Sequence, residues 1–592
     1  MSDFSGMISD MSEFKQCMES INGKKTPVHI TGMTGSQKSH FIFSVCSALG
    51  KKGFVITYDE NESGRISRDL SFLFCHEIKP FKSKEYMFYN VDASSHTSEY
   101  SRLRSLADIK NTPCAVASVD AVLTYTADPG LFYEYSFNIK IGDTVDMNDI
   151  IGKLVFMGYK RMPSVDGIGQ FSVRGSIIDI YSPSDSSAVR IDLFDDEVDS
   201  LRFFDVRTQL STENIDSVTV FPSKELLYDS KAALKAAHAI RQLKNENLYS
   251  DADKLENDGY FSSPDKYMPY LSTGLYTVFD YIDDDTVIFL DEAKMLYDNA
   301  EVFCKEEGEI ISDLMSKGLF PKTKMKYYID YTDVISFCGQ KTVLSISSIS
   351  HSCPDIYPKA LIGITAKSLQ NYSGKSEFFY DDIKYWLKMN YRVILVCGDE
   401  TRISNYINSF YDEGIEAARA SLQNCLPPYG KLYIIKGHLE KGFEYPTIKT
   451  VVISDADTSR THSIKIKNKK HSSRDAIKSF EDLSKGDYVV HRSHGIGQYV
   501  GIVQLAVDGN TKDYLKIKYK GSDYLYVPTN QLDFLSKYTG SENTHVKINS
   551  LGGSQWAKTV SRVRKSVDVL AQDLINLYAE RSRLRGHVFE KD

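Results

Sequence analysis

The chain has 592 residues, a formal net charge of -8 and 42% hydrophobic residues, which are ordinary values for a soluble globular protein. At about 150 residues per domain, this length allows roughly four domains, each able to bury its own core. No apolar run reaches the roughly 18 residues that cross a bilayer, and the acidic N-terminus lacks the basic start of a signal peptide. We therefore expect a cytoplasmic protein that does not contact a membrane, and the net charge argues against a chain coated in nucleic acid.

The metal-binding residue types are sparse. Nine cysteines occur without a Cys-x-x-Cys pair, so we predict neither a zinc cage nor a disulfide framework and expect buried thiols. His491 and His494 have a spacing that suits a metal, but zinc would need two further ligands and no cysteine follows Cys425. We predict no metal site and assign these histidines hydrogen-bonding roles at a glycine turn.

Residues 1–140 are predicted to form the first half of an α/β domain with a degenerate P-loop. From Pro27 the chain reads PVHITGMTGSQKSHFIFSVCSALG, an apolar strand, a glycine-containing loop and an apolar helix. A P-loop needs a glycine directly before its lysine, because the loop wraps backbone amides around phosphate. Gln37 stands there instead, although other members of the motif are present: Gly32, Gly35, Lys38 and Ser39. We expect no tight triphosphate binding, and a plain strand-loop-helix connection is the alternative.

Residues 141–222 are predicted to form a small α+β domain inserted into the first one. Phe171 and Val173, and then Ile178 and Ile180, alternate with polar or small residues, which is the period of a half-buried strand. The stretch 154–205 resembles the excinuclease B homology region of bacterial transcription-repair coupling factors, which the damage-loading protein of nucleotide excision repair shares.

That resemblance implies that Arg174, Arg190 and Phe194 bind the excinuclease protein UvrA. Arginine and aromatic side chains dominate binding energy at interfaces, so an exposed group of them fits a hot spot. The alternative is that both arginines pair with carboxylates on neighbouring strands. The candidates for that pairing are Asp179, Asp192 and Asp195.

The first domain is expected to resume over residues 223–335. Its apolar run VIFLDEAK, residues 287–294, ends in Asp291 and Glu292 as a Walker B strand would. Paired acids also begin helices, because the helix dipole favours negative charge there, and we interpret these two as remnants of a nucleotide site. The first 480 residues contain no complete helicase motif set, which favours a module that recruits over one that translocates. We predict no catalytic residue in this chain.

A further α/β domain of unknown role is predicted over 340–457. YRVILVCGDE and TVVISDADT have the apolar runs of buried strands, and residues 381–390 have the pattern of a helix. Residues 458–480 are basic and lack an apolar period, so we predict a flexible linker. Its charge would favour DNA phosphate at low salt, but a solvated linker is the preferred interpretation.

Residues 481–550 are predicted to form a small antiparallel barrel. In DYLKIKYK the apolar Leu515, Ile517 and Tyr519 alternate with lysines, and hairpin turn signals flank this strand at 508–509 and 520–523. GDYVVHRSHGIGQYVG and LYVPTNQLDFLSKY resemble the RNA-polymerase-interacting domain of transcription-repair coupling factors, a module also found in the CarD family of transcription regulators. The resemblance implies an SH3-like or Tudor-like barrel whose edge strand adds to the polymerase beta subunit.

In that family the main polymerase contact falls at Leu505, with Gln504 and Val507 as its neighbours. The alternative is that Leu505 is one more core leucine. After Trp556, apolar residues at helical spacing predict an amphipathic helix over 556–592, which in the family leads into a DNA translocase.

The predicted fold is therefore a multi-domain α/β protein: a P-loop-like parallel sheet with an inserted α+β domain, a further α/β domain, a small antiparallel barrel and a long helix. The resemblance implies a monomeric factor of transcription-coupled repair that recruits the excinuclease protein UvrA and tethers RNA polymerase through its beta subunit. ATP and Mg²⁺ would serve a C-terminal motor that also carries the contact with double-stranded DNA, and this chain would need no cofactor. Two alternatives stay open, a CarD-type regulator and a nucleotide-dependent, helicase-like enzyme that uses the residual P-loop.

Overall fold

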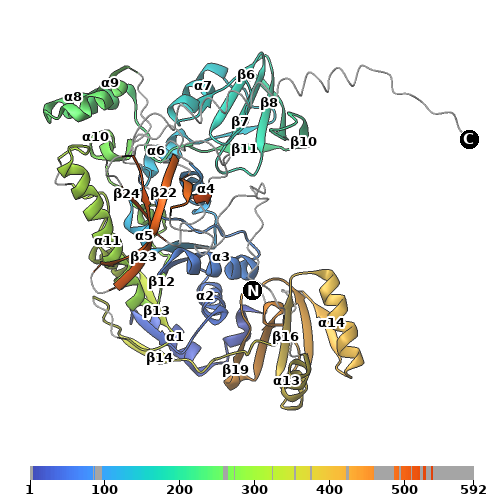
Figure 1. The fold of residues 1–592 in the computed structure, drawn as a ribbon. Coiled ribbons are helices and arrows are strands. Elements are labelled where there is room, and N and C mark those ends of the chain that lie inside the picture. Colours follow the sequence, from blue (N-terminus) through green and yellow to red (C-terminus); the bar gives the residue numbers. More distant parts are fainter. Residues whose placement is uncertain are drawn as a thin grey trace, which may run out of the picture. The chain divides into compact units, whose positions relative to one another are not determined.

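The computed structural model contains two compact units (Figure 1). The described residues of the first unit end at residue 458, and those of the second begin at residue 486. In the first unit the described residues are 4–84, 86, 96–257, 264–272, 274–322, 325–351, 355–373, 376–421 and 426–458. In the second they are 486–491, 495–507, 510–520, 524–528, 535–537 and 548. The predicted linker at 458–480 lies outside them apart from residue 458, as does the predicted helix at 556–592.

A six-stranded parallel sheet forms the centre of the first domain. Its strand order is β14-β1-β13-β12-β2-β3, and every neighbouring pair is parallel. The fully buried run VIFLD makes β12 a central strand, because a parallel sheet is covered on both faces. The strands, in sheet order, are Ala360–Gly363, Val28–Thr31, Thr342–Ser347, Val287–Asp291, Gly53–Thr57 and Cys114–Ser118.

Helices connect these strands. Asp59 caps α3 by accepting a hydrogen bond from the backbone N–H of Glu62, and α2 follows the glycine loop directly after Gly35. The helices of this domain before the insertion are α1 (Ser12–Asn22), α2 (Ser36–Leu49), α3 (Glu60–Phe74), α4 (Thr97–Asp108), α5 (Val119–Leu123) and α6 (Pro129–Tyr135). After it come α8 (Ser230–Gln242), α9 (Tyr249–Asn257), α10 (Met268–Leu271), α11 (Ala293–Ser316) and α12 (Tyr331–Gly339).

The inserted domain has its own sheet and core. Strands β4 (Phe137–Lys140) and β11 (Ser217–Val220) pair antiparallel at its entrance and exit, and α7 spans Met147–Phe156. Its main sheet has the order β10-β9-β8-β7-β6-β5. Phe171, Ile178 and Ile180 are buried in the domain core, as predicted, but the intervening Ser172 and Asp179 are buried as well, so these strands are not half-buried there. The strands, in that order, are Ser211–Asn214, Glu197–Phe204, Ala188–Phe194, Ile177–Tyr181, Gln170–Arg174 and Lys160–Arg161.

The third domain has a mixed sheet of order β15-β19-β20-β16-β18-β17. Helices α13 (Ser376–Lys388) and α14 (Glu400–Asp412) pack on one face of it (Figure 1). The strands, in sheet order, are Lys367–Ser368, Phe443–Tyr445, Thr450–Ser454, Arg392–Cys397, Leu432–Lys436 and Ala417–Ala420.

The predicted start of this domain at residue 340 is wrong, because β13 and β14 belong to the sheet of the first domain and β15 is the first strand of the third. An apolar run predicts a buried strand but carries no information about the sheet in which it pairs.

The second unit contains a five-stranded antiparallel sheet of order β24-β23-β22-β21-β25. Leu515, Ile517 and Tyr519 are buried in its core, as their alternation predicts. The strands in chain order are β21 (Tyr488–His491), β22 (Gly495–Val507), β23 (Asn510–Lys518), β24 (Tyr524–Pro528) and β25 (Leu535–Lys537).

Most of the described cysteines are buried, as predicted. Among the described cysteines Cys75 is exposed and Cys304 is half-buried, so the expectation of buried thiols is wrong at Cys75. The described residues include no cluster of three or more His, Cys, Asp or Glu side chains that could hold a metal ion, and His494 lies outside them. No helix in the described part of the chain is long and apolar enough to cross a membrane.

Glu307 gives the first domain a measurable pH dependence. It lies half-buried on α11, and burial together with the carboxylates of Glu306 and Asp120 raises its pKa to about 7. The folded state therefore holds an extra proton between about pH 4.5 and pH 7, and stability falls as the pH rises through that window. Glu307→Gln should lack this component. Between pH 5 and pH 8 the free energy of unfolding of the parent should therefore fall relative to that of the variant. Urea unfolding at both pH values measures the difference.

Glu309→Gln, on an exposed position of the same helix, is the matched control and should follow the parent at both pH values. An identical pH dependence in Glu307→Gln and the parent would contradict the assignment.

Candidate functional site

One buried carboxylate holds both predicted arginines of the inserted domain. Asp179 lies on β7 opposite Arg190 of β8, and its side chain is 0% exposed. Arg190 donates to it twice, from Nε to Oδ1 at 2.8 Å and from Nη2 to Oδ2 at 3.1 Å. Arg174, on β6, donates from Nη2 to Oδ2 at 2.6 Å. The pairing that the sequence left as an alternative is therefore present, and it fixes the direction of two guanidinium groups.

The three predicted residues differ in exposure. Phe194, at the end of β8, is 79% exposed, and the side chain of Arg174 is 46% exposed. Arg190 is only 14% exposed, because its guanidinium lies 4.7 Å from the ring of Phe204 and donates to the backbone oxygen of Gln209 at 3.3 Å. Pairing with Asp179 therefore leaves an aromatic ring and one cation open to solvent.

Arg202 also lies on this side of the sheet, and an exposed apolar residue follows its strand in the chain. Arg202 on β9 lies opposite Arg190 and pairs with Asp192, and Leu210, after β9, is 68% exposed. Sequence reasoning missed both. Arg202 could have been found from the register of β8 with β9, whereas Leu210 follows a turn and belongs to no periodic pattern.

A cluster of buried charged side chains connects the inserted domain to the first domain. Glu225, just after the insertion, pairs with Arg102 of α4 and with Lys84 at 3.3 Å, and its backbone N–H donates to Glu99 at 3.1 Å. Lys84 also reaches Asp265 at 3.0 Å. These contacts join the exit of the insertion to α4.

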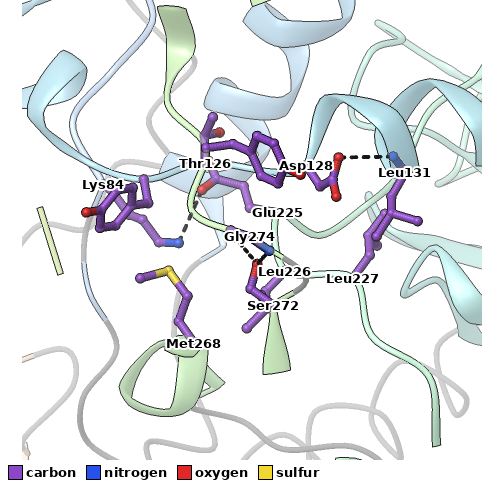
Figure 2. Close-up of a pocket in the computed structure, with 12 residues that line it drawn as sticks. Lys84, Thr126, Asp128, Leu131, Glu225, Leu226, Leu227, Met268, Ser272 and Gly274 are labelled. Atoms are coloured by element: carbon purple, nitrogen blue, oxygen red, sulfur yellow. Dashed lines mark hydrogen bonds and ion pairs between the residues drawn. The ribbon is translucent and has the colours of Figure 1, made fainter. Parts of the chain in front are cut away.

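The cavity beside this cluster is small (Figure 2). Its volume of about 10 Å³ suffices for about one water molecule, so it holds no small-molecule substrate. Its lining residues are Lys84, Tyr125, Thr126, Asp128, Leu131, Glu225, Leu226, Leu227, Met268, Ser272, Gly274 and Tyr276.

The residues of the degenerate nucleotide site do come together. Lys38 Nζ lies 2.6 Å from Asp291 Oδ1 and 2.7 Å from Glu292 Oε1, and the lysine side chain is 5% exposed. Glu292 also accepts a hydrogen bond from the backbone N–H of Ser348 at 2.8 Å. Its φ of +52° lies in the left-handed region, which costs energy for a residue with a side chain and shows that the contacts around it hold it there.

Burial and charge oppose each other in this triad. Burial by itself would lower the pKa of Lys38, but the carboxylates of Asp291 and Glu292 outweigh it and raise that pKa. Burial raises the pKa of Asp291 to about 6. At neutral pH the pair is therefore ionised, and the ammonium group that would contact phosphate in a working P-loop is bound to two acids of the same chain.

The loop itself is also filled. The side-chain oxygen of Gln37 accepts a hydrogen bond from the backbone N–H of Thr34 at 2.9 Å. The residue that replaces the motif glycine is therefore the hydrogen-bond partner of one of the loop amides. Gly32 has a φ of +87°, and a Cβ atom there would lie 2.3 Å from the backbone oxygen of Ile364. Ser39 donates to Asp69 at 3.0 Å. The groups that would cradle phosphate thus contact protein atoms instead.

The predicted polymerase contact lies on β22. This strand pairs with β21 only over residues 495–498. Beyond them, within the described sheet, its one neighbouring strand is β23. A β-bulge between Tyr499 and Gly501 marks the change. Leu505 pairs with Lys512 and lies inside the one-sided stretch, as do its predicted neighbours Gln504 and Val507. The structure describes the backbone of these three residues but not their side chains.

The second unit also presents a basic face. On β23 and just after it, Lys518 and Lys520 are exposed on the side opposite the buried core residues. Lys516, on the same side, lies with Nζ 4.2 Å from the ring centre of Tyr524.

Breaking the lysine triad should destabilise the first domain strongly. Lys38→Met leaves two buried carboxylates without their cation, and we expect a loss of about 3–5 kcal/mol in the free energy of unfolding. Adding Asp291→Asn should recover part of it, because one of the two stranded charges disappears. Urea unfolding measures both variants. Lys384→Met, which breaks an exposed pair with Glu413, is the matched control and should cost about 1 kcal/mol or less. Equal losses for Lys38→Met and Lys384→Met would contradict the role of the triad.

Comparison with known proteins identifies two regions of the chain. Residues 137–226 match the family described as UvrB interaction domain, and residues 483–539 match the CarD-like/TRCF RID domain. The chain is 30% identical to the transcription-repair-coupling factor of Bacillus subtilis (strain 168) over 623 aligned residues, which cover 100% of this chain and 52% of that protein. It is 28% identical to the transcription-repair-coupling factor of Staphylococcus aureus (strain USA300), with 95% of this chain and 49% of that protein covered.

The chain thus spans about half the length of the curated relatives that it matches. The two matched regions coincide with the inserted sheet and with the C-terminal antiparallel sheet. Both features were predicted from residue patterns at these places, and the sequence match extends through the domains between them. The chain is therefore a relative of the transcription-repair-coupling factors, corresponding to their N-terminal part with its UvrB interaction domain and its RID domain.

Proposed function

We propose that this chain acts in transcription-coupled nucleotide excision repair as a bridge between RNA polymerase and the excinuclease protein UvrA. The observation that carries the proposal is the presence of a UvrB interaction domain and an RID domain on one chain. A standalone regulator of the CarD type would leave the domains that precede the RID domain without a role.

The inserted domain would bind UvrA through its exposed ring and cation. Phe194 offers a large apolar surface at low entropic cost, and Arg174 reaches solvent from a guanidinium that Asp179 already holds in place. Arg190 is largely buried, so we assign it a supporting role in which it shares Asp179 with Arg174. Such a face suits a partner surface with an acidic rim and an apolar pocket.

The C-terminal sheet would bind the polymerase beta subunit by strand addition. Between Val500 and Val507, β22 has a neighbouring strand on one side within the described sheet, so its other edge can accept main-chain hydrogen bonds from a partner. Leu505 lies within this stretch, where its side chain would add specificity to a contact that the backbone alone leaves nonspecific.

ATP-driven movement along DNA belongs, in this proposal, to the half of the relatives that this chain does not match. In the chain itself Lys38 is paired with Asp291 and Glu292, and Gln37 occupies a loop amide. We therefore propose that the described part of the chain recruits partners and does not hydrolyse nucleotide.

Capture of UvrA tests the first contact. Arg174→Ala combined with Phe194→Ala should weaken capture by about 30-fold or more, the scale of a hot spot of about 2 kcal/mol. Asp179→Asn keeps both arginines but removes the charge that orients them, and it should weaken capture less. Affinity by surface plasmon resonance measures both variants. Tyr411→Ala, at an equally exposed aromatic of the third domain, is the control and should bind as the parent does; unchanged affinity in the double variant would refute the contact.

Pull-down of a polymerase beta-subunit fragment tests the second contact. Leu505→Arg should reduce retention of the fragment by at least about tenfold, because a charge placed at the centre of an added strand must be desolvated. Leu361→Arg, on an exposed position of β14, is a control of the same chemistry and should leave retention unchanged. If both variants retain the fragment like the parent, β22 is not the docking edge.

A further inference from the structure

The segment 437–442, between β18 and β19 of the third domain, lies on the helices that follow the phosphate loop. The backbone N–H of Glu440 donates to Asp69 Oδ1 of α3 at 2.9 Å, and that of Lys441 donates to Ser36 Oγ at the start of α2 at 3.1 Å. Asp69 and Ser36 are buried. Two amides of the third domain are thus satisfied by buried polar groups of the first.

The approach is close enough to require glycine. A Cβ atom at Gly437 would lie 1.9 Å from the ring of Phe72 on α3, well inside any tolerated contact. Gly442, at the other end of the segment, donates its backbone N–H to Asp457 at 2.7 Å, which anchors the segment to its own domain. Between them Leu439 is fully buried. The segment is therefore clamped from both sides.

Aromatic packing extends the contact beneath the segment. His40, on α2, is buried and lies 3.2 Å from the hydroxyl of Tyr445 and 3.1 Å from the backbone oxygen of Phe4. Burial lowers the pKa of His40 to about 4, so the ring is neutral at physiological pH and packs as an aromatic group. Its ring centre lies 5.6 Å from that of Phe443. One apolar core runs continuously from α2 to β19.

A second set of contacts joins the loop itself to the third domain. Thr34 Oγ1 and Ser368 Oγ of β15 lie 2.7 Å apart. Ile364, just after β14, donates its backbone N–H to Thr31 at 2.9 Å and places its oxygen over Gly32. The chain therefore passes from the sheet of the first domain to that of the third directly over the glycine loop.

We infer that the degenerate phosphate loop, together with α2 and α3, forms a fixed joint for the third domain, with residues 437–442 of the same chain as its occupant. Of the polar side chains of the loop, that of Ser36 contacts Lys441 of the third domain. The others are already bound within the first domain: Gln37 to Thr34, Lys38 to Asp291 and Glu292, and Ser39 to Asp69. A nucleotide could enter only by displacing the segment.

The joint has a mechanical consequence. In the sequence the third domain lies between the first domain and the C-terminal sheet, so the covalent chain that joins this sheet to the first domain passes through the joint. A fixed joint transmits orientation and force, whereas a nucleotide-gated one would release them with each turnover. This conclusion holds whichever partners the two ends of the chain bind.

Hydrogen exchange read by mass spectrometry tests the joint in the full chain. Peptides covering α2 and residues 432–445 should exchange slowly in the parent, and saturating MgATP should not change them. Gly437→Ala should accelerate exchange in both regions together, by about tenfold or more, because the clash with Phe72 separates them. Asp69→Asn is the milder second variant, in case the glycine substitution prevents folding, and it should accelerate the same two regions.

The inserted strands β6 to β9 report whether the effect is local, and they should keep their protection in both variants. Gly152→Ala is the matched control, because a Cβ atom there meets nothing within 4 Å, and it should exchange like the parent. Acceleration confined to residues 432–445, with α2 unchanged, would overturn the inference. Increased protection of residues 32–41 by MgATP would overturn it as well, since it would show a loop that still binds nucleotide.

Discussion

The buried ammonium group of Lys38 connects several elements in the centre of the first unit. It joins the helix that follows the glycine loop to the end of β12, and through Glu292 to the turn after β13. Because the group is almost fully buried, it is held only if both acids stay in place, and the left-handed backbone at Glu292 persists for the same reason. The loop that could have opened for a nucleotide is thereby closed, and it becomes a surface on which another domain can rest.

The inserted domain uses the same physical arrangement with the charges reversed. There one buried carboxylate, Asp179, holds two arginines, whereas in the first domain one buried ammonium holds two acids. The functional results differ because of exposure. Lys38 and its acids are enclosed and stabilise the fold, but the side chain of Arg174 is 46% exposed and remains accessible to a partner. A buried counter-ion can thus either enclose a charged group within the fold or hold it in a fixed orientation at the surface.

Much of the site could be anticipated from the residue pattern. Gln37 in place of the motif glycine predicted a failed phosphate loop, and the structure shows its side chain on the amide of Thr34. The alternation around Phe171 and Ile178 predicted the inserted strands, and the alternation around Leu515 predicted the C-terminal ones. Arg202 was missed because its place opposite Arg190 depends on which strands are neighbours. Two alternatives for Arg174 and Arg190, binding and pairing, could not be separated in sequence, and the structure shows pairing with exposure retained at Arg174.

By itself the sequence determined several of the buried strands, where the insertion and the C-terminal sheet lie, and that the nucleotide motif is incomplete. These depend on local periodicity and on single residue identities, which a linear chain records directly. Only the tertiary structure decided that β13 and β14 complete the first sheet, that Asp179 serves two arginines, and that residues 437–442 rest on the phosphate-loop helix. Each of these joins residues far apart in the chain, and such pairings depend on packing and burial that no local pattern carries.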